Sequence, residues 1–424
     1  MKIAVVGLGY VGLATMAYFL NEGHEVTGID IDSYKMTVLN SGKLPIKEPG
    51  ILKIFEERKK KIKFSSSYSD LSSNSFVFVC VGTPEGKNGM PDMTHFDNAM
   101  NSIMANAEYE SIIIIKSTVP IGTSRHWSEL IEKKRSKSHV KIVFSPEFLR
   151  QGFALKDVTK PSRVVFGIKD DESNSKIERL YKNITSKKIF TDYETAELAK
   201  YASNNFLALK ISYINEISNI ANVFGADTQT VKEIMTLDPR IADGCLESGI
   251  GFGGGCFVKD SKALLAQAKQ KGINANIIKS SIDRNEEQNN ILIKKLYGIK
   301  NSYKMSIAFV GLTFKKETSD LRGSIAINNL KSLDNKYTKI SLYEPNISVS
   351  DLNKYGHKVY ESIADLVNDN DVIMIYNERK ELNDIPPSYF RNKIVLDGRN
   401  VLTKEIAMEC KYYFSPKLGE IKKK

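Results

Sequence analysis

Short apolar runs alternate with longer amphipathic segments along the first half of the chain. The runs are KIAVVG, EVTGID, FVFVCVGTP, SIIIIKST, KIVFSPE and RVVFGI. Buried runs of this length between segments of helical periodicity are typical of a parallel sheet covered by helices. The same alternation returns late in the chain, in SIAFVG, KISLYEP, DVIMIYN and KIVLDGRN. The pattern therefore predicts two α/β domains, one at each end of the chain.

One long helix is predicted between these domains, over Thr191 to Phe224. Apolar residues recur in it at steps of three or four: Ala199, Ala202, Phe206, Leu209, Tyr213, Ile217, Ile220 and Phe224. Thr191 and Glu194 have the spacing of an N-terminal capping box, and Gly225 stands at the C-terminal stop. At about 1.5 Å per residue the helix is roughly 50 Å long, which suits a bridge between the domains or a dimer seam.

Glycines after the first strand predict a dinucleotide site. Gly7, Gly9 and Gly12 open a helix, and the second strand ends in Asp30. This order of strand, glycines, helix, strand and acid is the dinucleotide fingerprint, with the pyrophosphate on the helix N-terminus. Asp30 would bind the ribose diol and repel a phosphate there, which favours NAD over NADP. Lys35, close behind, would tolerate NADP, and we give the acid more weight; the alternative is a glycine turn without a ligand.

Three further loops follow predicted strands, at the sheet edge where open α/β folds bind ligands. VGTPEG contains Thr83, and KSTVPIGTS contains Ser117 and Thr118. Their hydroxyls could donate to phosphate or nicotinamide, and they could equally be turn and cap residues. SPEFLRQG places Glu147 at another strand end, where the alternative is an ordinary surface glutamate.

The stretch GFGGGCFVKD concentrates glycine around Cys256. Glycine is costly to order, so four in five positions indicate a sharp turn or a very close approach of the backbone. The loop lacks the G-K-[ST] ending of a phosphate-binding P-loop, which leaves the seat of a nucleophile. A helical pattern follows Cys256, and a helix N-terminus together with Lys259 would favour its thiolate. The alternative is a small buried cysteine in a tight turn.

Composition adds constraints on the class of protein. The 424 residues are 42% hydrophobic and 26% charged, and the net charge is +11. The lysines are scattered among acids without interleaved aromatics, so we expect no nucleic-acid partner. The four cysteines form no C-x-x-C pair and the five histidines are dispersed, which favours a metal-free cytoplasmic protein. No stretch reaches the roughly 18 apolar residues of a membrane span, so we expect no membrane partner.

An ordered set of motifs carries a family resemblance. The set is VGLGYVGL, LPIKEPG, GTPEG, KSTVPIGT, SPEFLRQGFALKD, AELAKYASNNFLALKISYINEI, DPRI, GFGGGCFVKD, GLTFKKETSDLR and DGRN. It resembles the UDP-glucose 6-dehydrogenases of the UDP-glucose/GDP-mannose dehydrogenase family. The resemblance implies two Rossmann-like doubly wound domains joined by a long central helix, in a homodimer that forms through that helix. It also implies oxidation of the primary alcohol of UDP-glucose to a carboxylate with two NAD+ and one water.

The resemblance implies three segments and a set of catalytic residues. The segments are an NAD-binding domain (1–190), a central helical domain (191–298) and a UDP-sugar-binding domain (299–424). Cys256 matches the thiol that forms a hemithioacetal and a thioester. Lys200 and Asp260 match a pair that holds a water or oxyanion at the reacting carbon, and Asn204 an amide that stabilises it. Thr118 and Glu147 match residues that assist proton transfer and thioester hydrolysis.

Binding residues are implied in the same way. The cofactor set comprises Gly7, Gly9, Tyr10, Val11, Gly12, Asp30, Lys35, Thr83, Thr118 and Arg322. The substrate set comprises Glu147, Phe148, Leu149, Lys200, Asn204, Arg240, Phe252, Gly253, Phe257, Lys315 and Arg399, with Arg240 acting across a subunit interface.

Two other functions stay open at this stage. A sibling enzyme would act on GDP-mannose or an N-acetylated UDP-hexose, although FLRQG resembles the glucose branch. A non-catalytic NAD-binding regulator would keep the fold without the chemistry. The presence of Cys256, Lys200, Asn204 and Asp260 together argues against the regulator.

Overall fold

The computed structural model describes residues 1–134, 139–316, 318–333, 337 and 339–423. The chain divides into two compact units. The first comprises Met1–Ser203 and Ala263–Ile273, and the second comprises Asn204–Lys262 and Asn274–Lys424. Two helices, α8 (Tyr193–Phe224) and α10 (Phe257–Gln270), begin in one unit and end in the other.

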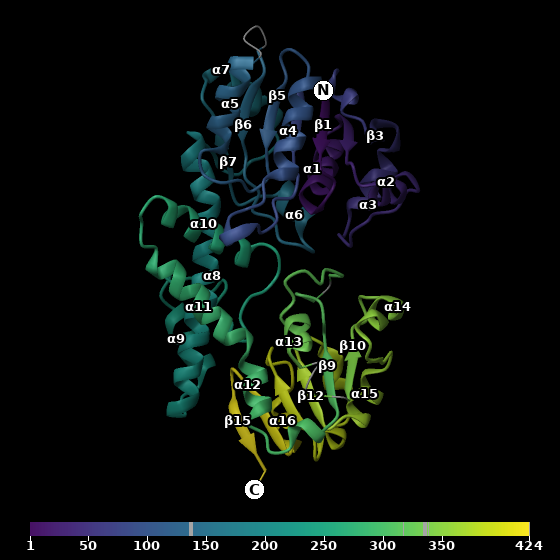
Figure 1. The fold of residues 1–424 in the computed structure, drawn as a ribbon, viewed down its shortest axis with the longest axis vertical. Helices are drawn as coiled ribbons and strands as arrows, with labels where there is room; N and C mark the ends of the chain where they lie inside the picture. The colour runs from purple at the N-terminus through teal and green to yellow at the C-terminus, as the bar shows by residue number, and fades with distance from the viewer. Residues whose placement is uncertain (135–138, 317, 334–336, 338, 424) are drawn as a thin grey trace. The chain divides into compact units, whose positions relative to one another are not determined.

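The first unit is built on an eight-stranded sheet with the order β3-β2-β1-β4-β5-β6-β7-β8 (Figure 1). Its strands are β1 (Lys2–Val6), β2 (Glu25–Ile29), β3 (Ile62–Ser65), β4 (Phe76–Val79), β5 (Ile112–Ile115), β6 (Lys141–Phe144), β7 (Val164–Gly167) and β8 (Lys188–Thr191). Neighbouring strands run parallel, except β6 and β7, which are antiparallel. The strand order reverses between β1 and β4, which is where doubly wound sheets bind ligands.

Helices cover both faces of this sheet. They are α1 (Tyr10–Asn21), α2 (Ser33–Asn40), α3 (Ile51–Glu57), α4 (Thr94–Asn106), α5 (Thr123–Lys134), α6 (Ala154–Thr159) and α7 (Asp171–Leu180). Two apolar cores result, one that includes residues of α1, α3 and α7 and one that includes residues of α4, α5 and the start of α8. Every residue of β4, β5 and β7 is buried, which explains their unbroken apolar sequences.

The second unit contains a seven-stranded sheet with the order β11-β10-β9-β12-β13-β14-β15. Its strands are β9 (Ile307–Val310), β10 (Ile340–Tyr343), β11 (Lys358–Val359), β12 (Val372–Ile375), β13 (Ile394–Asp397), β14 (Tyr412–Ser415) and β15 (Gly419–Lys422). Only the pair of β14 and β15 is antiparallel among these strands. The remaining helices are α9 (Thr228–Thr236), α11 (Asn276–Asn289), α12 (Ile291–Tyr297), α13 (Ile325–Leu333), α14 (Val349–Leu352), α15 (Ile363–Asp369) and α16 (Lys404–Glu409).

The predicted fold class, two Rossmann-like doubly wound domains joined by a long helix, is confirmed. All ten strands predicted from apolar runs are present. The predicted boundaries of the three segments, at 190/191 and 298/299, stay predictions. Among the described residues, no helix is both long enough and apolar enough to cross a membrane.

The predicted start of the long helix is wrong by two residues. Thr191 ends β8, where it pairs with Gly167, and so it cannot cap the helix. Asp192 takes that role, because its carboxylate accepts hydrogen bonds from the backbone N–H (2.7 Å) and hydroxyl (2.9 Å) of Thr195. Gly225 does follow the last turn, with a φ of +69° that favours glycine.

Candidate active site

The glycine loop after β1 has the geometry of a dinucleotide site. Gly7 has a φ of +91°, and a Cβ there would lie 2.8 Å from the Cys80 carbonyl carbon. A Cβ on Gly12 would lie 1.9 Å from the Gly7 oxygen, so only glycine lets α1 pack this close to the strand. Around Gly9, in contrast, the described part of the chain places no neighbouring atom within 4 Å of a Cβ position, and the Gly9 position offers no side-chain cap to α1. This is the loop geometry with which a helix N-terminus binds a pyrophosphate.

Asp30 stands at the end of β2, mostly buried. Its Oδ2 accepts from the Leu8 N–H at 2.7 Å and pairs with the Lys35 ammonium at 3.0 Å. Its Oδ1 accepts from the Asp32 N–H at 3.0 Å. The carboxylate thus fixes the glycine loop and keeps lone pairs for a ribose diol, so the residues present fit NAD. The structure places Lys35, the residue that would tolerate NADP, directly on Asp30.

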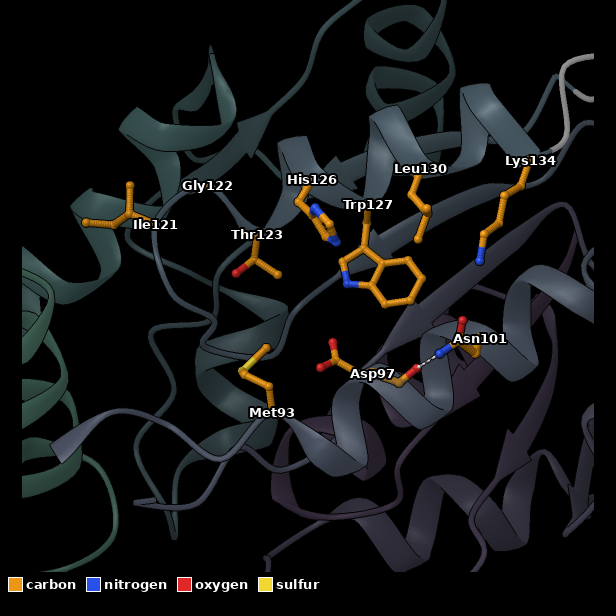
Figure 2. Close-up of a pocket in the computed structure, with 10 residues that line it drawn as sticks. All are labelled: Met93, Asp97, Asn101, Ile121, Gly122, Thr123, His126, Trp127, Leu130 and Lys134. Carbon is orange, nitrogen blue, oxygen red and sulfur yellow. Dashed lines mark hydrogen bonds between the residues drawn. The ribbon is translucent and has the colours of Figure 1, made fainter. Parts of the chain in front are cut away.

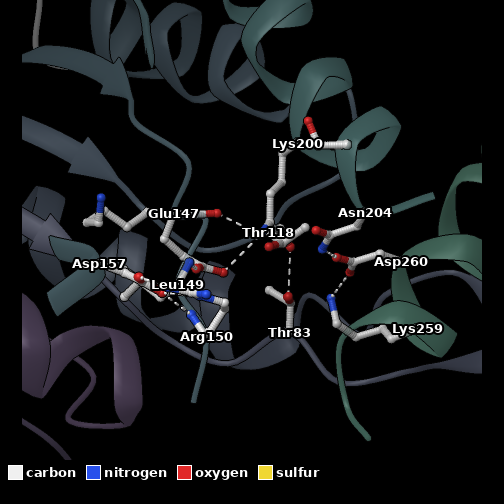
Figure 3. Close-up of polar contacts among 12 residues, drawn as sticks. Thr83, Thr118, Glu147, Leu149, Arg150, Asp157, Lys200, Asn204, Lys259 and Asp260 are labelled. Carbon is white, nitrogen blue, oxygen red and sulfur yellow. Dashed lines mark hydrogen bonds and ion pairs between the residues drawn. The ribbon is translucent and has the colours of Figure 1, made fainter. Parts of the chain in front are cut away.

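The next two strands end in hydroxyl-bearing loops. Thr83 donates to the Thr118 carbonyl at 2.7 Å, which ties the loop after β4 to the loop after β5 (Figure 3). Ser117 donates instead to the Val81 carbonyl at 2.7 Å, the role of a turn residue that sequence reasoning left open. The Thr118 side chain is half-buried.

A buried carboxylate that sequence reasoning missed holds the loop of Thr118. Glu197, on α8, accepts from the backbone N–H groups of Gly122 (2.6 Å) and Ser124 (2.8 Å) at the start of α5. Gln267 accepts from the Ile121 N–H at 2.7 Å. Burial raises the pKa of Glu197, and the hydrogen bonds oppose that shift. In the sequence, Glu197 is an acid between Ala196 and Lys200 in the long helix, and the structure shows that all three are buried.

Glu147 and Lys200 form an ion pair in the first unit, in which the Lys200 side chain is 5% exposed and the Glu147 side chain 12% (Figure 3). The Lys200 ammonium lies 3.0 Å from Glu147 Oε1 and donates to the Glu147 carbonyl at 2.6 Å. Glu147 Oε2 accepts from the Leu149 N–H at 2.5 Å. Burial opposes ionisation of this carboxyl, but Lys200, the Leu149 N–H and Lys116 together hold its pKa below the usual value. Glu147 is therefore no ordinary surface glutamate.

Phe148 lies beside this pair. The guanidinium carbon of Arg163 is 3.7 Å from the centre of its ring, and the Lys200 ammonium is 5.4 Å from it. Cations at such distances are attracted to the face of the ring. The ring and Lys200 thereby hold each other in place, so the predicted substrate residues Glu147, Phe148 and Lys200 form one cluster.

In the second unit, the glycines around Cys256 are required by the chain's own packing. A Cβ on Gly251 would lie 2.4 Å from the Asn285 side chain. A Cβ on Gly253 would lie 2.5 Å from the Gly323 carbonyl, and one on Gly254 would lie 2.6 Å from the Phe314 ring. The glycine backbone thus approaches other segments of the same chain very closely, as the sequence predicted. Around Gly255, no atom from the described residues of neighbouring segments lies within 4 Å of a Cβ position.

Cys256 is exposed and precedes α10 directly. Its carbonyl accepts from the Asp260 N–H at 2.8 Å, which begins the helix. The thiol thus stands at a helix N-terminus, as predicted, and it is not the buried turn cysteine of the alternative. Phe252 and Phe257 flank this loop with ring centres 5.9 Å apart, edge to face.

Asp260 is buried and lies between two partners (Figure 3). The Asn204 amide donates to its Oδ2 at 2.7 Å, and the Lys259 ammonium lies 2.8 Å from its Oδ1. Lys259 is therefore an ion-pair partner of Asp260, a role that sequence reasoning did not assign to it. Lys200 and Asn204 are one turn apart on α8, the first in one unit and the second in the other.

The remaining predicted binding residues differ in their burial and in their partners. Arg399 is partly buried, donates to the Tyr376 carbonyl at 3.1 Å and has a pKa lowered by desolvation. It lines a pocket of about 170 Å³ together with Ile211, Cys245, Glu247, Gly249 and Gly251. Arg240 and Arg322 are exposed, and each forms an ion pair with a nearby aspartate, with nitrogen–oxygen distances of 2.5 Å and 2.6 Å. No group of three or more metal-ligating side chains occurs within the described parts of the chain.

A larger hollow of about 610 Å³ lies between α4 and α5 in the first unit (Figure 2). Asp97 faces Trp127 across it, and burial raises the pKa of Asp97. None of the predicted site residues lines this hollow, and we assign no ligand to it.

We expect the Glu147–Lys200 pair to give the protein a specific acid sensitivity. Because the folded pKa of Glu147 is lowered, its contribution is present above the unfolded value of about 4.3 and is lost as pH falls through the folded pKa. Glu147→Gln should cost about 3 kcal/mol of unfolding free energy at pH 7, and much less at pH 3. Denaturant unfolding at both pH values measures this. The exposed Glu132→Gln, which loses only a surface pair with Lys169, should change stability little at either pH. A loss for Glu147→Gln that is independent of pH would contradict the assignment.

Comparisons with known proteins agree with this geometry. Three models of the UDP-glucose/GDP-mannose dehydrogenase family match the chain: the NAD binding domain at residues 1–185, the central domain at 194–287 and the UDP binding domain at 308–404. The UDP-glucose 6-dehydrogenase TuaD of Bacillus subtilis is 33% identical over 97% of this chain and 92% of its own.

Solved structures are similar over the whole length. A UDP-glucose dehydrogenase from Pyrobaculum islandicum has a TM-score of 0.90 at 29% identity, covering 98% of this chain and 97% of its own. A UDP-D-ManNAc dehydrogenase from Pyrococcus horikoshii has a TM-score of 0.86 at 27% identity, covering 95% and 96%. The cofactor is NAD, the substrate is a nucleotide sugar, and the chain belongs to the UDP-glucose/GDP-mannose dehydrogenase family of oxidoreductases.

Proposed function

We propose that this protein is a UDP-glucose 6-dehydrogenase that oxidises UDP-glucose to UDP-glucuronate. The observation that carries the proposal is the exposed thiol of Cys256 at the start of α10, in a chain whose other unit fits NAD. Similarity to the TuaD protein and to the Pyrobaculum islandicum dehydrogenase supports UDP-glucose as the substrate. A sibling substrate, an N-acetylated UDP-hexose or GDP-mannose, is the second candidate, because the Pyrococcus horikoshii neighbour acts on UDP-D-ManNAc. A cytoplasmic location stays a prediction.

The proposed reaction consumes one UDP-glucose, two NAD+ and one water. NAD+, which the glycine loop after β1 and Asp30 would hold, would supply the hydride acceptor for the sixth carbon of the sugar in each of two oxidations. Between them, the Cys256 thiolate adds to the aldehyde carbon, which makes the second oxidation yield a thioester. Water then cleaves the carbon–sulfur bond, releases the carboxylate and returns the thiolate.

Polar residues of the two units are proposed to supply the remaining functions. Asp260, fixed by Asn204 and Lys259, orients water or accepts its proton. The Lys200 ammonium stabilises the oxyanion that forms at the sixth carbon. Thr118 and Glu147 assist proton transfer from the sugar hydroxyl and during hydrolysis of the thioester.

Binding of the UDP-sugar is proposed to rest on cationic groups and aromatic rings. Arg399 and Lys315 would bind the diphosphate by charge-assisted hydrogen bonds. The rings of Phe252 and Phe257, with the backbone of Gly253, would contact the nucleotide and sugar. Phe148 and Leu149 would contact the sugar from the first unit, and Tyr10, Val11 and Arg322 would contact the cofactor.

We further propose a homodimer that forms through α8, with Arg240 reaching the partner's substrate. Phe206, Tyr213 and Ile220 are spaced by seven residues on α8 and are 62%, 48% and 49% exposed. Two helical turns separate each from the next, so they form one apolar stripe.

In sedimentation velocity the protein should have twice the mass of one chain, and Phe206→Glu should dissociate it. Tyr303→Glu, a change at an exposed aromatic off the stripe, should stay dimeric. A wild-type monomer would refute the dimer.

A substrate panel tests the proposed activity. UDP-glucose, UDP-N-acetylhexoses and GDP-mannose are each mixed with enzyme and NAD+, and NADH absorbance is followed. We expect two NADH per UDP-glucose and a kcat/KM at least about tenfold above that for each sibling, about 1.4 kcal/mol of discrimination. A sibling that is turned over faster would replace UDP-glucose as the substrate. Absence of NADH with every sugar would favour a non-catalytic NAD-binding protein.

Variants of Cys256 separate the steps of the reaction. Cys256→Ser should bind both substrates but stall as a covalent ester, because an alkoxide leaves far less readily than a thiolate. Intact-protein mass spectrometry after incubation with UDP-glucose and NAD+ should show the added sugar nucleotide. Cys256→Ala should form no adduct and no acid. Turnover of Cys256→Ala at the wild-type rate would exclude the thiol as nucleophile.

Asp30 and Lys35 together predict the cofactor preference. The Asp30 carboxylate would meet the extra phosphate of NADP+ as a like charge, so kcat/KM should favour NAD+ by at least about tenfold. Lys35, 3.0 Å from Asp30, offsets part of that repulsion. Lys35→Ala should therefore widen the preference. Equal efficiency of the wild type with both cofactors would show that Lys35, rather than Asp30, decides.

A further inference from the structure

The second unit repeats the loop geometry of the first. Gly311 follows β9 with a φ of +83°, and its N–H donates to the Tyr343 carbonyl at the end of β10. The next residue, Leu312, donates to Glu344 Oε2 at 2.9 Å. Glu344 thus occupies, after β10, the place that Asp30 occupies after β2.

The two acids differ in what surrounds them. Glu344 Oε2 also accepts from the Thr313 N–H at 3.1 Å, and Oε1 accepts from the Asn346 N–H at 3.0 Å. The buried Arg379 guanidinium forms an ion pair with Oε1. The Glu344 side chain is 0% exposed. Its carboxylate is fully engaged by its own chain and is closed to a ribose.

The loop itself also departs from a dinucleotide loop. Thr313 stands where the first loop has Gly9, and Lys315 stands where it has Val11. No helix begins at this point, since the next one, α13, starts at Ile325. The segment after β9 therefore presents a lysine where the first unit presents a helix N-terminus.

Glu344 is connected to Lys315 through Thr313. The Thr313 hydroxyl lies 3.1 Å from Glu344 Oε2 and 2.9 Å from the Lys315 carbonyl. The Asn377 amide donates to the Thr313 carbonyl at 2.6 Å and to its hydroxyl at 2.9 Å. A Cβ on Gly311 would lie 2.5 Å from Asn377 Cβ, so the loop has little room to shift on that side.

We propose that Glu344 is a positioning residue, which holds the loop from Gly311 to Lys315 so that Lys315 meets the diphosphate of the substrate. The proposal rests on the proposed function, in which Lys315 binds UDP. Loss of the carboxylate should release the loop, because two successive backbone N–H groups and the Thr313 hydroxyl lose their common acceptor. The free-energy cost of ordering the loop on binding would then reduce the affinity that the contact of Lys315 with the diphosphate provides.

A double-mutant cycle tests this by calorimetric titration of UDP and, separately, of NAD+. Glu344→Gln should weaken UDP binding about tenfold, the effect of roughly one charge-assisted hydrogen bond, and Thr313→Val about threefold. In a Lys315→Ala background both losses should shrink to less than about twofold. NAD+ affinity should stay constant throughout. Steady-state kinetics should show a higher KM for UDP-glucose with nearly unchanged kcat.

Thr313→Val keeps the Glu344–Arg379 pair and covers the case in which Glu344→Gln does not fold. Ser302→Ala is the control, since it removes a buried hydroxyl of the same unit that bonds to Tyr337, and it should leave UDP affinity unchanged. Equal losses with and without Lys315, or no loss at all, would overturn the positioning role while leaving the enzyme assignment intact. A wild-type protein that binds no UDP would overturn both.

Discussion

Buried carboxylates that accept backbone N–H groups hold the loops at which this protein would do its chemistry. Glu48, Glu197, Glu344 and Asp397 are each nearly or fully buried, and each accepts hydrogen bonds from at least two backbone N–H groups of a loop or helix start. Removing a carboxylate from water costs several kcal/mol, and hydrogen bonds to a charged group return about 1.5–3 kcal/mol each. The hydrogen bonds from the loop stabilise the buried carboxylate, and the same hydrogen bonds hold the loop in one conformation.

This constraint explains why the candidate site can be assembled from irregular segments. The loop of Thr118 is held by Glu197, and the backbone N–H of Leu149 is held by the side chain of Glu147. Asp397, at the end of β13, accepts from the N–H of Arg399, so the predicted diphosphate ligand lies on a fixed turn. Binding a flexible diphosphate already costs conformational entropy of the ligand. Loops that are rigid before binding add little conformational entropy cost of their own.

The sequence predicted the parts of the fold that depend on local pattern. Every strand with an unbroken apolar run was found, because burial on both faces removes polar positions. The missed strands are β3, β8, β11, β14 and β15. In β3 and β8, at the edges of the first sheet, every residue is half-buried or exposed, so their sequences resemble loops. The capping box failed because pairing of Thr191 with Gly167 depends on a segment 24 residues away. The site residues taken from motifs stay predictions. Glu197 and Glu344 carry no such motif, since their role depends on N–H groups that the fold brings to them.

The ion pair of Glu147 and Lys200 also limits what Glu147 can contribute to the proposed reaction. Burial alone would raise the pKa of this carboxyl, but Lys200, the Leu149 N–H and Lys116 lower it, so it is a weak base near neutral pH. A general base is most effective when its pKa is near the working pH. In the proposed reaction, Glu147 would therefore assist proton transfer mainly by orientation, as an anion that positions Lys200.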